Sequence, residues 1–124
     1  MYDRSLLLEL LLEIEEAIRR IERRFKGIQN ANDFTGSDEG LDRLDGIGMM
    51  LIAISGNIRR ISQLTGDDFF NQYPEIAWSD IKGIRNILSH DYFDIDPDEV
   101  YEICSKDIAV LKQVLEKMRY DVFQ

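Results

Sequence analysis

The sequence has very few of the residues that build disulfides and metal sites. Its 124 residues include one cysteine, Cys104, and one histidine, His90. A single cysteine excludes an internal disulfide and any cysteine-rich zinc site, and with one histidine we expect neither a structural metal nor a cofactor. Cys104 falls within a helical apolar pattern, so we expect it to behave as a small core hydrophobe.

Long apolar runs and a surplus of basic residues are also missing. The N-terminal apolar patch from Leu6 to Leu12 contains Glu9 and is too short to span a bilayer. No small-residue cleavage site follows this patch, which favours a cytoplasmic protein that does not enter a membrane. The 24 acidic and 15 basic residues give a net charge of −9, which argues against a dedicated, tight nucleic-acid binder.

The basic residues that are present gather in two places along the chain. Arg59 and Arg60 are adjacent, and a larger group closes the first apolar segment: Arg19, Arg20, Arg23, Arg24 and Lys26. A locally basic surface on an acidic protein is therefore compatible with the sequence. A nucleic acid reached only through such a patch would bind weakly and would be released by salt.

Apolar residues that recur every three or four positions predict two long helices, over about 4–26 and about 41–64. In the first helix, Leu6, Leu10 and Ala17 widen the apolar stripe beyond what one core face requires. The extra width suggests a second partner surface, such as a contact with another subunit. The segment between the two helices is predicted to be a loop.

The second half of the chain predicts two further helices. An aromatic connector over 69–78 is expected to plug the core, and Ser79 is a good N-cap for a short third helix at about 80–89. Asp96 is placed to cap a fourth helix with Pro97 in its first turn. No alternating strand pattern or internal repeat is present. We therefore interpret residues 1–124 as a single all-α domain, an antiparallel up-down four-helix bundle with a short third helix.

The end of this third helix carries the run Arg-Asn-Ile-Leu-Ser-His, residues 85–90, which is followed at once by Asp-Tyr-Phe. Histidine is the side chain that ordinarily exchanges a proton near neutral pH, and it occurs here as His90 alone. Arg85 supplies a planar cation suited to gripping phosphate, and Asn86 shares a helix face with His90. Proton transfer with anion stabilisation is the minimum needed to break a phosphodiester without a metal.

A purely structural interpretation of the same run stays open. A histidine near a helix C-terminus can hydrogen-bond free carbonyl groups, and Arg85 can pair with one of the many surface acids. Under this interpretation Tyr92 and Phe93 would belong to the core. The spacing of the residues alone does not decide between the two interpretations.

The run matches a known family pattern over a longer stretch. The pattern Arg85-Asn86-x-x-x-His90-x-Tyr92 follows the segment Pro-Glu-Ile-Ala-Trp-Ser-Asp-Ile-Lys-Gly-Ile, residues 74–84. With these features the chain resembles the HepT-like branch of the HEPN superfamily, which consists of small all-helical bacterial and archaeal proteins. The resemblance covers almost the whole chain.

The resemblance implies a metal-independent endoribonuclease toxin with Arg85 and His90 as the catalytic pair. It also implies a homodimer that joins two motif helices across its interface. A minimal nucleotidyltransferase would be the antitoxin, and it can modify the residue corresponding to Tyr92 with AMP. We expect Asn86 to hold the RNA substrate or to orient His90. Other candidates for a supporting or substrate-binding role are Ser89, Arg59 and Arg60.

Two other functions remain compatible with these residues. The chain could be a non-catalytic nucleotide-binding or docking subunit of a minimal nucleotidyltransferase, with Arg85 gripping a phosphate and Tyr92 presented to the partner. It could also be a structural dimer without a site. One departure from the family pattern is notable, because Gly56-Asn57 stands where many relatives carry a Gly-Glu pair.

Overall fold

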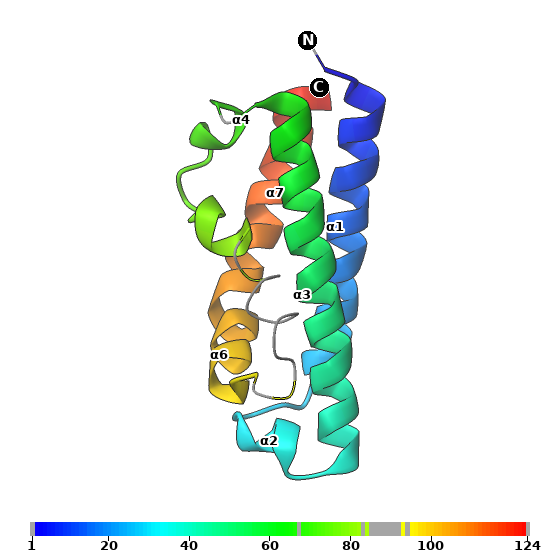
Figure 1. Cartoon of the computed structure of the whole chain (residues 1–124), viewed down its shortest axis with the longest axis vertical. Helices are drawn as coiled ribbons and strands as arrows, with labels where there is room; N and C mark the ends of the chain where they lie inside the picture. Colours follow the sequence, from blue (N-terminus) through cyan, green and yellow to red (C-terminus); the bar gives the residue numbers. More distant parts are fainter. Residues whose placement is uncertain (1, 67, 83, 85–92, 94, 124) are drawn as a thin grey trace.

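The computed structural model describes residues 2–66, 68–82, 84, 93 and 95–123. Within these residues the secondary structure is helical and contains no strand, which confirms the all-α prediction. Three helical columns run along the long axis: α1 (Arg4–Phe25), α3 (Asp38–Thr65), and the stack of α6, η2 and α7 (Figure 1). α3 runs antiparallel to α1 and parallel to α7, and both chain ends lie at the same end of the molecule.

The α1 helix begins and ends within one residue of its predicted bounds. The Asp3 side chain accepts a hydrogen bond from the Leu6 N–H at 3.1 Å, which satisfies a free donor of the first turn. At the other end, Gly27 adopts a φ of +87°, in the left-handed region that glycine enters without steric cost. Arg43 of α3 donates to the carbonyl oxygens of Arg24 and Lys26 at 3.1 and 2.6 Å, which covers the open end of α1.

The connection between α1 and α3 differs from the predicted loop. A short helix, α2 (Asn32–Thr35), places Phe34 in the core with no exposed surface. α3 then begins at Asp38, three residues before the predicted start, because the Ser37 hydroxyl accepts from the Gly40 N–H at 3.0 Å. Acidic residues in the first turn of α3 complement the positive end of the helix dipole.

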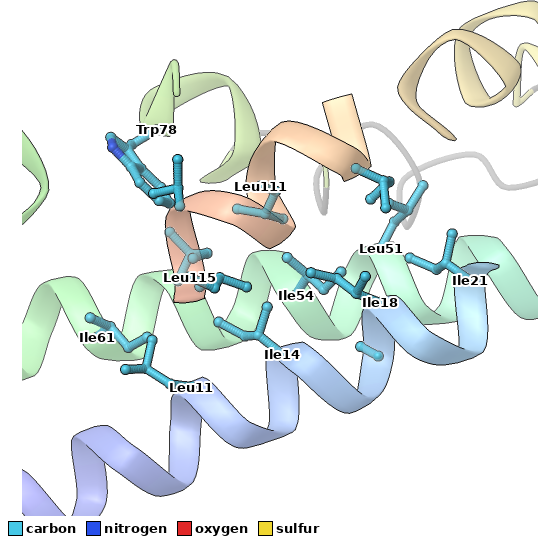
Figure 2. Close-up of a cluster of buried hydrophobic side chains, with 14 of the residues drawn as sticks. Leu11, Ile14, Ile18, Ile21, Leu51, Ile54, Ile61, Trp78, Leu111 and Leu115 are labelled. Atoms are coloured by element: carbon cyan, nitrogen blue, oxygen red, sulfur yellow. The ribbon is translucent and has the colours of Figure 1, made fainter. Parts of the chain in front are cut away.

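The core lies where the apolar faces of α1, α3 and α7 meet. Figure 2 shows side chains of α1 facing those of α3 across the interface, with α7 and Trp78 closing one side. The residues labelled there are all buried: Leu11, Ile14, Ile18, Ile21, Leu51, Ile54, Ile61, Trp78, Leu111 and Leu115. Burial of each such side chain contributes on the order of 1.5–3 kcal/mol, so packing of these stripes holds the columns together.

The aromatic connector plugs the core as predicted. It includes the short helix α4 (Asp68–Asn71), and its rings of Phe69, Phe70, Tyr73 and Trp78 are buried. The Phe70 and Trp78 ring centroids are 4.4 Å apart, and the Trp78 indole N–H donates to the Tyr73 carbonyl at 2.8 Å. Buried indole nitrogens need such a partner, so this bond fixes the plug at the start of the next helix.

The helix that leads to the Arg85–His90 run is described at residues 78–82 and 84, which are helical. The Ala77 carbonyl accepts from the N–H groups of Asp80 and Ile81, so helical structure is already present at Trp78. Ser79 therefore lies inside the helix, and its predicted role as the N-cap is wrong. The rest of the predicted third helix lies outside the described residues, so the four-helix arrangement stays a prediction.

The last column is one helical stack with an irregular middle. α6 (Pro97–Glu102) begins as predicted, because Asp96 accepts from the Asp98 N–H at 2.9 Å and Pro97 occupies the first turn. A π-helical segment, η2 (Ile103–Asp107), then joins it to α7 (Ile108–Phe123). The π segment was not predicted. The sequence gives one sign of it: the apolar residues Ile103 and Ile108 are five positions apart, one more than the longest step of a regular helical stripe.

Cys104 lies in this π segment and packs against the core. Burial raises the pKa of its thiol to about 12, which keeps the group protonated at neutral pH. This environment confirms the expected core role of Cys104.

No helix in the described ranges is both long and apolar enough to cross a membrane.

We expect Cys104 to react with an aromatic disulfide reagent at least about tenfold more slowly in the folded protein than in the unfolded chain, because only the thiolate attacks. The measurement is the rate of thiolate-dye release at mildly alkaline pH, with and without concentrated guanidinium chloride. Equal rates under the two conditions would contradict the buried, protonated thiol.

Candidate functional site

The whole predicted catalytic run falls outside the described part of the chain, because residues 85–92 are not among the described residues. The predicted site residues in this stretch are Arg85, Asn86, Ser89, His90 and Tyr92. Their assignments as catalytic, supporting or modified residues therefore stay predictions. The structure instead describes what borders them and what holds the chain that leads to them.

The two borders of the run have opposite environments. Ile84, directly before it, is half-buried and packs against the core. Phe93, three residues after His90, is 99% exposed. A core role for Phe93, which the structural interpretation of the run required, is therefore wrong. At this position the chain presents an aromatic ring to solvent.

Arg59 contacts Lys82, three positions before the run, as does Ser55 one helical turn earlier on α3. The Arg59 guanidinium donates to the Lys82 carbonyl oxygen from Nε at 3.2 Å and from Nη2 at 2.8 Å. The Ser55 hydroxyl donates to the same oxygen at 3.1 Å. Two side chains of α3 thus converge on one main-chain atom of the helix described at residues 78–82. Arg60, the other arginine of the pair, is exposed.

Sequence reasoning singled out Arg59 as a substrate-binding candidate and did not single out Ser55. The available signal was the spacing, because residues four apart in a helix share a face. Ser55 and Arg59 are polar residues on one face of α3. Ser55 has no exposed surface. A buried polar side chain must find a partner, and here the partner is the Lys82 carbonyl.

The basic group at the end of α1 is partly neutralised within the helix. Glu16 accepts hydrogen bonds from Arg19 at 2.9 and 2.7 Å and from Arg20 at 2.8 Å. These bonds stabilise the carboxylate and lower the pKa of Glu16 to about 2. Because the group is exposed, the pairs add little stability, but they reduce the positive field that an RNA phosphate would meet.

Asn57, where the sequence differs from the expected Gly-Glu pair, joins α3 to α1. It is buried on α3, and its side-chain amide donates to the Leu10 carbonyl at 3.2 Å and to a Glu13 carboxylate oxygen at 2.9 Å. Both partners are acceptors on α1. A glutamate carboxylate in place of this amide could donate to neither, so Asn57 has a helix-joining role that requires a donor.

A surface groove of about 570 Å³ lies between the outer faces of α1 and α3. Its apolar lining is Leu8, Leu12, Ala17, Met50 and Ala53, and its charged lining is Glu9, Glu13, Glu16 and Arg20. Of the residues that widen the α1 stripe, Leu10 and Ala17 are buried, whereas Leu6 is 41% exposed. Part of the predicted extra width therefore serves the core of the chain itself.

A second pocket, of about 550 Å³, lies between the helix entering the run and the α6–α7 column. Its floor is apolar, and acids stand around it: Glu75, Asp80, Glu99 and Asp107. Negative charge disfavours RNA phosphate in this pocket. In the part of the chain that the structure describes, no group of three or more histidine, cysteine, aspartate or glutamate side chains is placed to hold a metal ion.

Comparison with known proteins shows which family the chain belongs to. A family model described as ribonuclease HepT-like matches residues 14–118. A Methanocaldococcus jannaschii protein named as a candidate RNase is 34% identical over 59 residues, which are 48% of this chain and 54% of that protein. A Thermococcus cleftensis protein named probable ribonuclease HepT is 36% identical over 53 residues, which are 43% of this chain and 48% of that protein.

A second Methanocaldococcus jannaschii candidate RNase is 33% identical over 55 residues, which are 44% of this chain and 46% of that protein. The chain spans about half the length of the curated relatives it matches. No solved structure matches it. The family model, by contrast, covers most of the chain, including the whole Arg85–His90 run, and on this ground the chain belongs to the HepT-like ribonuclease family.

Proposed function

We propose that this protein is a metal-independent endoribonuclease and that Arg85 and His90 are its catalytic residues. The observation that carries the proposal is family membership over a span that contains both residues in the family's spacing. His90 is suited to move a proton at neutral pH, and Arg85 is suited to stabilise an anionic phosphorus centre. Asn86, Ser89, Arg59 and Arg60 are candidates for supporting this pair or holding the substrate.

The proposed reaction is an internal transfer on the RNA backbone. The ribose 2′-oxygen loses its proton and bonds to the adjacent phosphorus, while the bond from phosphorus to the 5′-oxygen breaks and that oxygen gains a proton. The products are a 2′,3′-cyclic phosphate and a 5′-hydroxyl. His90 moves a proton in this exchange, and Arg85 stabilises the extra negative charge of the phosphorane-like transition state.

We propose a homodimer, in which one His90 serves as the base and the partner copy's histidine as the acid. The outer face of α3 is the candidate interface, together with the groove beside α1. Met49 is 59% exposed there, and Ala53 and Gly56 continue the same helical stripe. A Cβ added at Gly56 would meet no atom within 4 Å, so the chain's own packing does not require glycine at this position.

We expect Gly56→Ala to stabilise the monomer and weaken the dimer. Within a helix, alanine is more stable than glycine by about 0.5–1 kcal/mol, whereas a methyl group at a close helix crossing between copies would keep the two backbones apart. The measurement is sedimentation equilibrium with thermal unfolding at low protein concentration, and the control is Gln113→Ala at an exposed position of α7. A dimer as tight as that of the wild type would exclude this face.

We also propose that the protein acts in the cytoplasm as the toxin of a two-gene module, with a minimal nucleotidyltransferase as its antitoxin. Support comes from the family pattern around Tyr92, which is the candidate for modification with AMP. The added phosphate group would place negative charge and bulk beside the catalytic pair. RNA phosphates would then be repelled from the position that they must occupy for cleavage.

The experiment that tests the ribonuclease proposal is incubation of total cellular RNA with the purified chain in EDTA. Expected products carry 5′-hydroxyl ends, which polynucleotide kinase labels without prior phosphatase treatment. Mass spectrometry first establishes that Tyr92 is unmodified, and circular dichroism establishes that the sample is folded. Intact RNA from such a sample would overturn the ribonuclease and favour a docking subunit of the nucleotidyltransferase.

A further inference from the structure

The Lys82 carbonyl group accepts more hydrogen bonds than a main-chain carbonyl ordinarily does. Three donor atoms from α3 lie within 3.2 Å of it: one from Ser55 and two from Arg59. A carbonyl oxygen has two lone pairs, and a helical carbonyl usually accepts one backbone N–H. Here side chains of a neighbouring helix donate to it. The chain is therefore held at Lys82 by α3.

The Lys82 side chain is held by other groups in the same region. Its Nζ atom donates to the Ser62 hydroxyl at 3.0 Å and lies 5.7 Å from the centroid of the Phe70 ring. Ser62 belongs to α3, and Phe70 belongs to the aromatic plug. Both the main chain and the side chain of Lys82 are thus anchored to parts of the fold that the core holds rigid.

The anchored residue stands three positions before Arg85. A planar guanidinium that donates twice to one oxygen restricts its direction as well as its distance, which a single flexible donor does not. Ser55 adds a second direction from a fully buried position. Together these bonds restrict the position and the direction of the main chain at Lys82.

We propose that Arg59 and Ser55 form a positioning clamp that sets the placement of Arg85 and His90 through the Lys82 carbonyl. The inference rests on the ribonuclease function proposed above. Arg59 is then a positioning residue and does not bind an RNA phosphate. Small misplacements matter in catalysis, because an error of about 1 Å in the reacting groups can lower the rate by roughly 100-fold.

The clamp and a phosphate contact predict different kinetics for the same substitutions. Lysine keeps the positive charge of Arg59 but lacks the planar fork, and methionine keeps the apolar stem but has no donor. A clamp needs the fork, so both variants should lower kcat. A phosphate contact needs mainly the charge, so Arg59→Lys should then behave like the wild type and Arg59→Met should raise KM.

The experiment measures kcat and KM separately for cleavage of one RNA oligonucleotide. The variants are Arg59→Lys, Arg59→Met, Ser55→Ala and the double variant Ser55→Ala/Arg59→Met. Arg119→Met is the charge-matched control, because Arg119 lies on α7 and pairs with Glu15 at the surface. We expect Arg59→Met to lower kcat by about 10- to 100-fold with KM changed less than about twofold.

The double variant provides a second test within the same series. Both side chains donate to the same oxygen, so the loss of activity in the double variant should be smaller than the product of the two single losses. The control should retain the wild-type constants. A raised KM with kcat preserved in Arg59→Met, together with wild-type kinetics in Arg59→Lys, would overturn the clamp.

Hydrogen exchange tests the clamp without any RNA. We expect peptides that contain residues 78–84 to exchange at least about threefold faster in Arg59→Met than in the wild type, with α1 peptides unchanged. If the wild type cleaves no RNA, the ribonuclease proposal fails and the clamp is decided by this measurement alone. If Arg59→Met does not fold, Arg59→Lys and Ser55→Ala carry the same test. Unchanged exchange at 78–84 would exclude the clamp.

Discussion

Replacing His90 by alanine is expected to abolish RNA cleavage in EDTA while leaving the unfolding temperature unchanged. His90 is the one histidine of the chain, so in a dimer the substitution removes both the base and the acid. General acid–base catalysis contributes about 10²- to 10⁴-fold to rates, and both roles would be lost together. Cleavage by the variant should therefore fall to the background of the buffer.

Arg85→Ala is the matched test of anion stabilisation. Removing one group that stabilises transition-state charge costs about 10²- to 10³-fold in kcat. The measurement is the initial rate on a single oligonucleotide, with circular dichroism to establish folding.

For the histidine prediction, His90→Gln is the conservative control, because glutamine keeps a polar side chain but cannot exchange a proton near neutral pH. RNA cleavage at the wild-type rate by either histidine variant would contradict the catalytic role of His90.

The parts of the fold that depend on periodic apolar residues were predictable, and those that depend on single hydrogen bonds were less so. The α1 stripe predicted its helix to within one residue, because the periodic apolar residues form one face that packs into the core. The start of α3 was missed because the Ser37 hydroxyl extends the helix through polar residues that carry no apolar period. The π segment adds a residue to one turn, and a search at helical spacing does not detect it.

The candidate site shows a similar division. The proposed catalytic pair, Arg85 and His90, is visible in the sequence because it consists of side chains at a fixed spacing. The contact at Lys82 is not visible, because the acceptor is a main-chain carbonyl and every residue has one. The role of Asn57 was hidden for another reason. Its Leu10 partner lies 47 positions away, so only the packing of α3 on α1 brings the two together.

Asn57→Asp is expected to destabilise the protein by about 2–4 kcal/mol at neutral pH. The substitution keeps the shape of the side chain and replaces its donor by an acceptor. The new carboxylate would face the Leu10 carbonyl, which is 3.2 Å from the native amide nitrogen, and the Glu13 carboxylate, which is 2.9 Å from it. Both contacts become repulsive at a buried position, and this loss is a large part of a typical folding free energy.

The pH dependence separates this charge effect from a loss of packing. Burial and the adjacent Glu13 carboxylate raise the pKa of the introduced carboxyl group in the folded state above its unfolded value. The penalty is therefore fully present above that raised pKa and declines as the pH falls through it, because the protonated group can donate a hydrogen bond. Asn57→Ala removes the donor without adding charge, so its smaller cost should change little over the same pH range.

Urea unfolding of the wild type and both variants across this pH range measures the difference. We expect the two variants to converge on acidification and to diverge at neutral pH. Equal destabilisation at every pH would mean that the amide fills space without donating. Convergence would show that α3 is joined to α1 by a donor that a carboxylate cannot replace. The packing of α3 on α1 would then require the hydrogen-bond donor that the Asn57 amide supplies.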